Sequence, residues 1–494
     1  MKNYYITTAI PYANAKPHIG TAMDYLYGDI LLRYHAARGE NALMSIGTDE
    51  HGTKVEQKAA ENHVSPQKFV DDLQTDFVEM REKLNLDFAR IKNVRTTDAD
   101  HVRRVQEIWR KLDAAGVIYK STYEGWYCVG CEKFLTETEA REMNFICPDH
   151  DKKLEKLSEE NYYLRVSKFT DEIRAFATKN IVPAWRGKEI LELVKNGAQD
   201  VSISRPREKL LWGIPVPNDE TQIMYVWVDA LSNYITALNF PDADFATDFW
   251  GKNCEIVQIV GKDILRFHAI IWPAMLLALG LELPQKLLVH GFINVGGNKM
   301  SKSLGNVVSP LEIIADYGAD AFRYYFARHV PTFDDGDFTW EKFENSYNGE
   351  LANDLGNLIS RVARMLAKYE ISYQKVNLDE PKICEILESY DANFASLDVS
   401  RALENVWELT QFANQFVDAE KPWEVAKTDA KKLNKILLNL WAQILLVAKL
   451  LEPFLPETAA KICAIFDVKV GEKITQSAPI LFPKKYLHTE PPRK

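Results

Sequence analysis

The sequence from residue 4 to residue 27, YYITTAIPYANAKPHIGTAMDYLY, decides the fold of the first domain. Residues 4–9 form a short, largely apolar run that is typical of a buried strand. A turn rich in proline, asparagine and glycine follows, and residues 23–27 then indicate a helix. Residues 42–47 form a second apolar run. Strand, turn, helix and strand in this order predict a parallel sheet with crossover helices.

The rest of the chain changes its pattern several times. From about Ile118 it carries aromatics, paired cysteines and charge runs without helical periodicity, which indicates a small inserted domain. Apolar runs return at residues 223–228, 255–260 and 287–289, so we expect the sheet to resume there. After Trp340 apolar residues recur at helical spacing, which predicts a helix bundle.

A chain of 494 residues is too long for a single core. The expected fold class is therefore α/β, with a Rossmann-like parallel-sheet domain, an inserted domain and an all-α helix bundle. The expected boundaries are 1–117 for the first half of the sheet domain, 118–222 for the insertion, 223–290 for the second half, 291–345 for a linking domain with a lysine loop and 346–494 for the bundle.

Composition is that of an ordinary soluble globular protein, with 46% hydrophobic and 26% charged residues. The N-terminus carries no basic segment followed by an apolar core, and the most apolar stretch, residues 270–283, is short and contains a proline. We therefore expect a cytoplasmic protein without a membrane segment. The net charge of −10 does not exclude an RNA partner, because RNA binding needs only a local basic face.

Three of the six cysteines lie close together, in the pattern Cys128-x-x-Cys131 and, fifteen residues later, Cys147-x-x-His150. Two short ligand pairs across a loop are typical of a tetrahedral zinc site. The pattern predicts one structural Zn²⁺ per chain, which would staple an insertion too small for its own core. The other cysteines are interpreted as small buried hydrophobes: Cys254, Cys384 and Cys463.

Two segments carry groups suited to phosphate. His18-Ile19-Gly20-Thr21 opens a helix at the carboxyl end of a parallel strand, where open α/β sheets bind ligands and a helix N-terminus favours anions. The loop Lys299-Met300-Ser301-Lys302-Ser303 offers lysines that can follow a moving phosphate. The alternatives are that His18 only caps the helix and that the loop is only a solvated basic surface.

This pair of segments resembles the two signatures of class I aminoacyl-tRNA synthetases, His-Ile-Gly-His and Lys-Met-Ser-Lys-Ser. The second signature matches completely, whereas Thr21 replaces the last histidine of the first. A threonine hydroxyl can donate to a phosphate oxygen, but it cannot carry charge.

Three further segments resemble the methionine enzymes of this class: residues 47–52, 225–234 and 261–268. The resemblance implies that Asp49 pairs with the substrate ammonium group. Aromatic rings contact sulfur favourably, and tyrosine or histidine donors can bind a weak acceptor such as a thioether. The implied methionine site consists of Ile10, Tyr12, Asp49, Trp227, Ala230, Tyr234, Ile264 and His268.

The resemblance also implies the reaction. The carboxylate of L-methionine attacks the α-phosphorus of ATP, and the 3′-terminal hydroxyl of tRNA then displaces AMP. The implied catalytic groups are His18, Lys302, Lys299 and Thr21, with Mg²⁺ accompanying ATP. The implied ATP site consists of His18, Gly20, Thr21, Gly261, Asp263, Lys299 and Lys302.

Residues Asn357 and Arg361 lie one helical turn apart, and Trp423 follows an amphipathic helix. These positions resemble the family's readers of the CAU anticodon, which implies that both initiator and elongator tRNA(Met) are partners, for translation initiation and elongation. The alternative for Trp423 is an aromatic plug under a loop. The chain ends after the bundle, without the extra tRNA-binding and dimerising domain of some relatives, so we expect a monomer.

Several other functions compete with this interpretation. The isoleucine, valine and leucine enzymes carry a larger editing insertion, and the cysteine enzyme is expected to use zinc at its amino-acid site. A zinc-stapled RNA-binding protein without catalysis would not need the complete lysine loop. A small-molecule nucleotidyltransferase would not need Asn357, Arg361 or Trp423.

Overall fold

The structure, a computed structural model, describes residues 2–128, 133–135, 137–147, 152–300, 305–474 and 480–488. Its centre is a six-stranded sheet in the order β3-β2-β1-β14-β15-β9, in which all neighbouring strands run parallel. The strands are β1 (Asn3–Thr8), β2 (Asn41–Thr48), β3 (Ile91–Arg95), β9 (Ile181–Val182), β14 (Cys254–Gly261) and β15 (Lys286–His290).

Helices cover both faces of this sheet, and β1 shows why. Tyr4 and Ile6 belong to one hydrophobic cluster, whereas Tyr5 belongs to a second cluster. Successive side chains of a strand point to opposite faces, so a strand buried on both faces needs apolar residues at successive positions. The helices packed around the sheet are α1 (Ile19–Ala37), α3 (Pro66–Lys83), α4 (Ala99–Ala114), α8 (Val226–Thr236) and α9 (Trp272–Ala278).

The chain order of the strands creates a switch point between β1 and β14. The chain runs outward from β1 to β2 and β3, and it returns later to place β14 on the other side of β1. Connections therefore diverge at the carboxyl ends of these two strands and leave a crevice there, which is where open α/β sheets bind their ligands.

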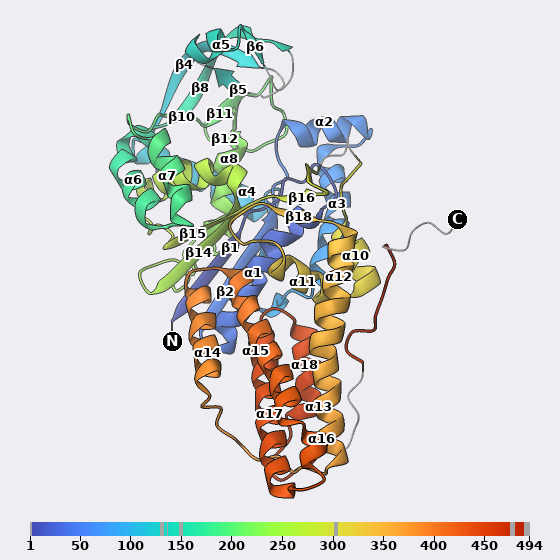
Figure 1. Cartoon of the computed structure of the whole chain (residues 1–494). Coiled ribbons are helices and arrows are strands. Elements are labelled where there is room, and N and C mark those ends of the chain that lie inside the picture. Colours follow the sequence, from blue (N-terminus) through green and yellow to red (C-terminus); the bar gives the residue numbers. More distant parts are fainter. Residues whose placement is uncertain are drawn as a thin grey trace, which may run out of the picture.

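The inserted region is built mainly from antiparallel strands (Figure 1, top). Its longest pair is β4 (Ile118–Cys128) with β8 (Glu155–Leu164), and α6 (Thr170–Lys179) and α7 (Ala184–Leu193) follow. The short strand β9 lies within residues 118–222 and yet pairs with β15 at the edge of the main sheet. The other strands are β5 (Lys133–Leu135), β6 (Ile146–Cys147), β7 (Lys152–Lys153), β10 (Val201–Ser202), β11 (Ser204–Pro206), β12 (Pro215–Val216) and β13 (Asp219–Met224).

The strand predicted over residues 223–228 is wrong. Strand β13 ends at Met224 and joins a small antiparallel sheet, and helix α8 begins at Val226. A short apolar run cannot by itself distinguish a strand from the first turn of a buried helix.

The linking region consists of β16 (Ile293–Val295), β17 (Asn298–Lys299), β18 (Gly336–Phe338), α10 (Pro310–Tyr317) and α11 (Ala319–Arg328). A long helical stretch then leads from the sheet into the bundle (Figure 1, bottom). The elements of the stretch and bundle are α12 (Trp340–Ser346), a π-helix (Tyr347–Gly356), α13 (Asn357–Lys368), α14 (Pro381–Ala395), α15 (Val399–Glu420), α16 (Pro422–Val425), α17 (Ala430–Leu451) and α18 (Pro456–Phe466).

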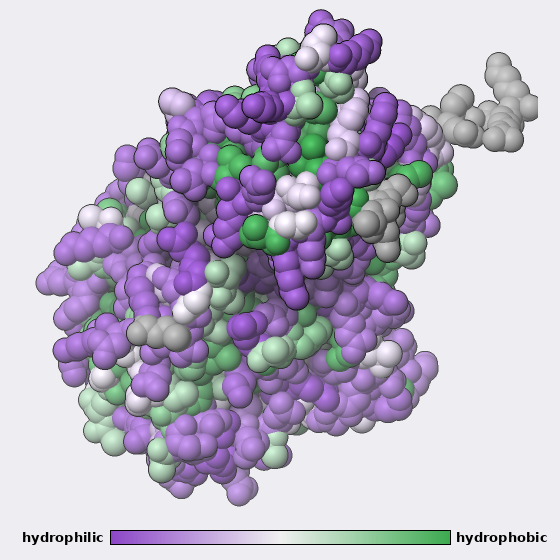
Figure 2. Space-filling model, turned by 90° about the horizontal axis from the view of Figure 1, so that it is seen from below, coloured by the Kyte–Doolittle hydropathy of each residue, from purple (hydrophilic) through white to green (hydrophobic). Residues whose placement is uncertain are grey.

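Helix α17 is the one described helix that is long and apolar enough to cross a membrane. Most of its apolar window is buried against the other bundle helices, as expected for a core helix, and Leu437, Trp441 and Ile444 are fully buried. Figure 2 shows hydrophilic side chains over most of the visible face, with apolar side chains in small groups between them.

Candidate active site

A cavity of about 930 Å³ opens at the switch point between β1 and β14. Its wall includes every residue predicted around methionine and every residue predicted around ATP except Lys302, which lies outside the described residues. The inserted region also contributes to the wall, through Glu159, Arg205 and Lys209. The structure thus brings together residues that follow β1 and β2 with residues from α8, from the end of β14 and from the lysine loop.

His18 is the N-cap of α1 as well as a cavity residue. Its Nδ1 accepts a hydrogen bond from the backbone N–H of Gly20 at 3.0 Å, so a neutral His18 ring carries its proton on Nε2. A Cβ atom on Gly20 would lie 2.9 Å from Cε1 of this ring, so the folded-back ring requires glycine there. The capping alternative and the ligand-binding interpretation are therefore compatible.

Thr21 completes the cap. Its Oγ1 accepts from the backbone N–H of His18 at 3.5 Å, which makes a reciprocal capping box. The hydroxyl proton of Thr21 is not used in this contact, so it can still be donated to an anion at the helix N-terminus.

Asp49 follows β2 and is held by backbone contacts with the turn after β1. Its N–H donates to the carbonyl oxygen of Pro11 at 2.9 Å, and its carbonyl oxygen accepts from Ala13 at 2.8 Å. The buried Oδ1 of Asp49 has no hydrogen-bond partner among the described residues. Burial, followed by the neighbouring Asp229 and Glu50 carboxylates, raises the pKa of Asp49 well above its usual range. A cationic ligand would relieve both conditions.

Helix α8 supplies one wall of the cavity through Trp227, Ala230 and Tyr234. The Trp227 ring stacks on Phe267 with a centroid distance of 3.8 Å and an interplanar angle of 9°. It also lies edge-on to His268, at 6.1 Å. These rings offer faces and edges to which a polarizable sulfur can pack.

Tyr234 in this wall is hydrogen-bonded to His268. His268 Nδ1 lies 3.0 Å from the Ile264 carbonyl oxygen, which can only accept, so Nδ1 carries the proton. His268 Nε2 then accepts from the Tyr234 hydroxyl at 2.7 Å. Burial lowers the pKa of His268 to about 4, which keeps the ring neutral at pH 7. The Tyr234 hydroxyl and the His268 N–H, which we expected to bind the thioether, thus already donate hydrogen bonds within the protein.

Asp229 lies behind the same wall. It accepts hydrogen bonds from His51 Nδ1 at 2.7 Å and from His101 Nε2 at 2.8 Å, and all three side chains are buried. Burial raises the pKa of Asp229, but the two histidines outweigh it and the net shift is downward. This cluster ties α8 to α4 and to the segment that carries Asp49.

The other side of the cavity is built by the ends of β14 and β15. Gly261 ends β14 and Asp263 follows it, and a Cβ atom on Gly261 would lie 2.8 Å from the Asp263 carboxylate. Lys299 in β17 places its Nζ 5.3 Å from the centre of the Phe292 ring. Phe292 is itself a cavity residue, so this ammonium group lies at the cavity wall.

His290 is a cavity residue that the sequence interpretation missed. Its Nε2 lies 2.9 Å from the Asp24 carboxylate, and its Nδ1 lies 2.8 Å from the Gly291 carbonyl oxygen. Burial lowers the pKa of His290, but the Asp24 carboxylate and these hydrogen bonds raise it more. Its place at the end of a predicted strand, the same place as Asp49 and Gly261, was the available signal.

The predicted zinc ligands are only partly described. Cys128 ends β4 and Cys147 ends β6, and their side chains are 1% and 2% exposed. Cys131 and His150 lie outside the described residues, and the described residues alone contain no group of three metal ligands. Among the described residues, the cluster around the two cysteines has five buried members, and so small a core fits a domain that is stabilised by a metal.

The other three cysteines differ from one another. Cys254 is buried, Cys463 is partly exposed and Cys384 is exposed, so the prediction of burial is wrong for Cys384. In α14 the buried residues are Ile383, Ile386, Tyr390 and Phe394, and helical periodicity turns Cys384 away from that face.

The three predicted anticodon readers lie in the helix bundle, remote from the cavity (Figure 1). Arg361 pairs with Asp418 at 2.7 Å, and its guanidinium group lies 5.1 Å from the centre of the Trp423 ring. Trp423 is 39% exposed and Asn357 is exposed. The exposed fraction of Trp423 disagrees with a fully buried plug and leaves an indole surface for a partner.

Comparisons with known families agree with this arrangement. A family model described as tRNA synthetases class I (M) matches residues 4–156 and 146–363. A second model, described as the anticodon binding domain of methionyl tRNA ligase, matches residues 357–481.

Known relatives match over nearly the whole chain. The methionine–tRNA ligase of Clostridium acetobutylicum is 41% identical over 485 residues, which cover 95% of this chain and 74% of that protein. The Thermotoga maritima ligase is 36% identical over 99% of this chain and 79% of its own length. The Mycobacterium tuberculosis methionyl-tRNA synthetase in complex with methionyl-adenylate superposes with a TM-score of 0.84, at 34% identity, over 98% of this chain and 99% of that one. This chain belongs to the methionyl-tRNA synthetases, a family of class I aminoacyl-tRNA synthetases.

Proposed function

We propose how the residues of the cavity divide the work of this methionine–tRNA ligase, which activates methionine with ATP and charges tRNA. The observation that carries the proposal is the Asp49 carboxylate, whose buried Oδ1 has no hydrogen-bond partner among the described residues, in the same cavity as an aromatic wall where Tyr234 and His268 already bind each other. One end of the cavity thus suits an ammonium group and the other suits an uncharged, polarizable side chain.

Asp49 binds the substrate ammonium group, and the side chain of L-methionine packs against the α8 wall. A buried carboxylate is stabilised when a cation pairs with it, so binding of the amino group offsets the desolvation of Asp49. The thioether meets ring faces instead of free donors, because Tyr234 and His268 bind each other. The remaining contacts come from Ile10, Tyr12, Trp227, Ala230 and Ile264.

The phosphates of ATP lie at the N-terminus of α1, where backbone N–H groups and the helix dipole favour negative charge. His18, Thr21 and Lys299 donate to phosphate oxygens from the described part of the site, and Lys302 joins them from the lysine loop. Gly20, Gly261 and Asp263 line the nucleotide side. We further propose that ATP enters as its Mg²⁺ complex, in which the cation screens the polyphosphate charge.

Activation is an in-line displacement. A carboxylate oxygen of methionine forms a bond to the α-phosphorus while the bond to the pyrophosphate oxygen breaks, so methionyl-adenylate and pyrophosphate are the products. The 3′-terminal hydroxyl of tRNA(Met) then attacks the carbonyl carbon and AMP leaves. No protein nucleophile is needed, so positioning and cationic stabilisation by His18, Lys299 and Lys302 supply the rate.

The other parts of the chain serve RNA binding and stability. Asn357, Arg361 and Trp423 read the anticodon of initiator and elongator tRNA(Met) from domain 346–494. One structural Zn²⁺ is held by Cys128, Cys131, Cys147 and His150, and it supplies folding energy to domain 118–222. We propose that the enzyme acts as a monomer in the cytoplasm.

The first test is exchange of labelled pyrophosphate into ATP, measured with each of the twenty amino acids in the absence of tRNA. We expect exchange with methionine alone. A signal with a different amino acid would contradict the assignment of the aromatic wall, and no signal from folded protein would contradict Thr21 as a working replacement for histidine.

The second test is Lys302→Ala in the same assay. We expect activation to slow by about 10²-fold to 10³-fold, typical of the loss of one group that stabilises developing charge, with little change in methionine affinity. The matched control is Lys342→Ala in the same linking region, where the lysine pairs with Asp337 at 2.8 Å. Equal losses in rate and affinity would contradict the role of Lys302.

A further inference from the structure

Three consecutive residues, Asp49, Glu50 and His51, send their side chains in three directions. Asp49 lines the cavity, Glu50 enters a polar network outside the cavity lining, and His51 reaches Asp229 on α8. Glu50 is fully buried. The position and the charge of Asp49 therefore depend on two buried neighbours with different partners.

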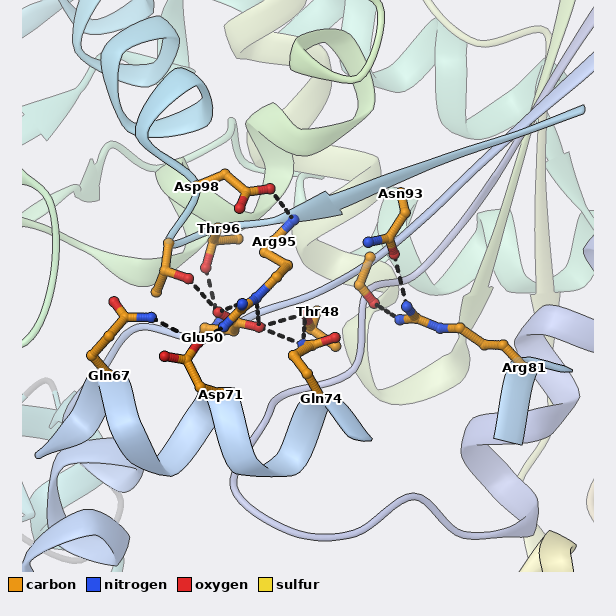
Figure 3. Close-up of polar contacts among 12 residues, drawn as sticks. Thr48, Glu50, Gln67, Asp71, Gln74, Arg81, Asn93, Arg95, Thr96 and Asp98 are labelled. Carbon is orange, nitrogen blue, oxygen red and sulfur yellow. Dashed lines mark hydrogen bonds and ion pairs between the residues drawn. The ribbon is translucent and has the colours of Figure 1, made fainter. Parts of the chain in front are cut away.

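The Glu50 carboxylate is surrounded by donors (Figure 3). Arg95 Nε lies 2.9 Å from Oε1 and 3.1 Å from Oε2. Thr48 Oγ1 and Gln74 Nε2 donate to Oε1 at 2.7 Å and 2.5 Å, and Thr97 donates to Oε2. A buried carboxylate can accept several hydrogen bonds, and both oxygens of Glu50 accept hydrogen bonds from at least two donors.

The backbone at Glu50 is fixed as well. Its N–H donates to Thr96 Oγ1 at 2.9 Å, and its carbonyl oxygen accepts from Trp212 Nε1 at 2.7 Å. Both peptide groups next to Glu50 are therefore held, and one of them is the peptide group that follows Asp49. The contacts of the Glu50 backbone with Thr96 and Trp212 therefore help to fix the direction of the Asp49 side chain.

The network also balances charge around Asp49. The carboxylates of Asp49, Glu50 and Asp229 lie near one another, and Glu50 and Asp229 are buried. Asp229 is met by two histidine N–H groups, whereas Glu50 is met by the guanidinium group of Arg95. Arg95 reaches Asp71 as well, at 2.5 Å. The Asp229 and Glu50 charges both act to raise the pKa of Asp49, after burial itself. Without Arg95 the charge of Glu50 would act on Asp49 uncompensated.

We propose that Arg95 and Glu50 are positioning residues for the substrate amino group: Glu50 fixes the loop that carries Asp49, and Arg95 balances the charge of Glu50 so that Asp49 can keep its carboxylate form. The proposal rests on the proposed role of Asp49 as the partner of the ammonium group. Neither Arg95 nor Glu50 is among the residues that line the cavity, so their proposed effect on the substrate passes through Asp49.

Other acidic, basic and histidine side chains also line the cavity with Asp49. They come from α1 and the turn before it, from α2 (Thr53–Glu61), from β8, from β11 and the segment after it, from the π-helix Phe267–Ile271 and from the segments at the ends of β14, β15 and β17: His18, Asp24, Lys54, Glu159, Arg205, Lys209, Asp263, His268, His290 and Lys299. These groups remain unchanged in every variant below, so their contribution to the pH dependence is common to all of them.

The test uses the dissociation constant of methionine, followed through tryptophan fluorescence as the pH is lowered from neutral. Binding weakens when Asp49 takes up a proton, because a neutral carboxyl cannot pair with the ammonium group. In Arg95→Gln this weakening should move to higher pH by about one unit, and in Glu50→Gln it should move to lower pH by about one unit. Shifts of opposite sign are the signature of charge balance, since a merely structural role predicts weaker binding in both variants.

Two further variants keep the test decisive if Arg95→Gln does not fold. Arg95→Lys keeps the charge and should restore the pH dependence of the wild type. The double variant Glu50→Gln with Arg95→Gln removes both charges, so its pH dependence should return toward that of the wild type even if Arg95→Gln alone does not fold. In all folded variants kcat for pyrophosphate exchange at saturating methionine should change by less than about 3-fold, since the loss lies in ground-state binding.

The matched control is Arg81→Gln. Arg81 is buried and donates to the Gly47 carbonyl oxygen at 2.9 Å, in strand β2, which leads to Asp49. Its other partners are Asn93 and Tyr25 instead of a carboxylate (Figure 3). We expect a lower melting temperature and an unchanged pH dependence of binding. Shifts of the same sign in Arg95→Gln and Glu50→Gln would overturn the inference, whereas a wild type without methionine-dependent exchange would overturn the proposed function instead.

Discussion

The hydroxyl of Tyr234 donates to Nε2 of His268 across 2.7 Å, and the opposite nitrogen of that ring donates to a backbone carbonyl. In the aromatic wall of the cavity, the Tyr234 hydroxyl and the His268 ring N–H are therefore both already used as donors. A side chain that needs hydrogen bonds would lose its water there without gaining a partner, which favours an uncharged thioether over polar side chains of similar length.

Replacing Tyr234 by phenylalanine should remove the hydrogen bond to His268 and leave the aromatic ring in the cavity wall. The ring remains, but the buried Nε2 of His268 loses its donor, which costs about 1–3 kcal/mol. We expect KM for methionine to rise by about 10-fold with a smaller change in kcat, measured by pyrophosphate exchange. Tyr5→Phe is the control, because the equally buried Tyr5 hydroxyl bonds the Tyr234 carbonyl oxygen outside the cavity wall. A similar KM in both variants would contradict the role of the Tyr234 hydroxyl.

The neutral state of His268 should make folding sensitive to acid. The pKa of His268 is lowered from 6.5 to about 4 by burial, so between these values the unfolded chain binds a proton that the folded chain does not. Its contribution to stability is therefore present above pH 6.5 and is lost as the pH falls toward 4. At about 1.4 kcal/mol per pKa unit, this loss is about 3 kcal/mol.

The measurement is thermal unfolding of the wild type and of His268→Asn over this pH range. The wild type should be destabilised by acid more steeply than the variant, which lacks the titrating ring. Parallel decreases in melting temperature would show that His268 is not the group responsible.

Replacing Trp423 by alanine should separate activation from charging. The partly exposed indole lies in the bundle under the Arg361 guanidinium, remote from the cavity. Loss of a stacking platform costs about 1–3 kcal/mol per base, so affinity for an anticodon stem-loop should fall by about 10-fold or more. Pyrophosphate exchange should remain at the wild-type rate.

The control for this variant is Trp185→Ala. Trp185 in α7 is 42% exposed and has an arginine, Arg186, at 4.0 Å from its ring centre, but it lies outside the bundle. It should bind the anticodon stem-loop as the wild type does. If Trp423→Ala slows activation as much as charging, the indole has a structural role instead.

Zinc content should depend on Cys128 and not on Cys254. Both side chains are buried, but Cys128 lies in the small cluster of the insertion whereas Cys254 lies in β14 of the main sheet. Metal analysis should find one Zn²⁺ per chain in the wild type and in Cys254→Ser, and a clear loss in Cys128→Ser. Protease resistance of the insertion should fall with the metal, because a bound structural metal contributes directly to folding. Zinc retained in Cys128→Ser would contradict the ligand set.

The sequence by itself determined the features that depend on neighbouring residues. The strand and helix around His18 follow from residues 4–27, because an apolar run, a proline-rich turn and a helix cap are local requirements. The lysine loop was also visible as a short motif, and the helical spacing after Trp340 indicated the bundle that the structure contains. The local pattern gave a wrong prediction where a strand and a buried helix have the same pattern of apolar residues. At residues 223–228 we predicted a strand of the main sheet, but α8 begins at Val226.

The tertiary structure alone decided which side chains meet. Glu50 and Arg95 are 45 residues apart, His51 and Asp229 are 178 apart, and Asp24 and His290 are 266 apart. Glu50 meets Arg95 because β2 pairs with β3, and the other two pairs join the ends of β2 and β15 to helices α8 and α1, which pack against the same parallel sheet. Strand order is set by packing over the whole chain, and no local pattern encodes it. Hence the kinds of residue in the site could be predicted from the sequence, whereas the contacts that set their charge and direction required the fold.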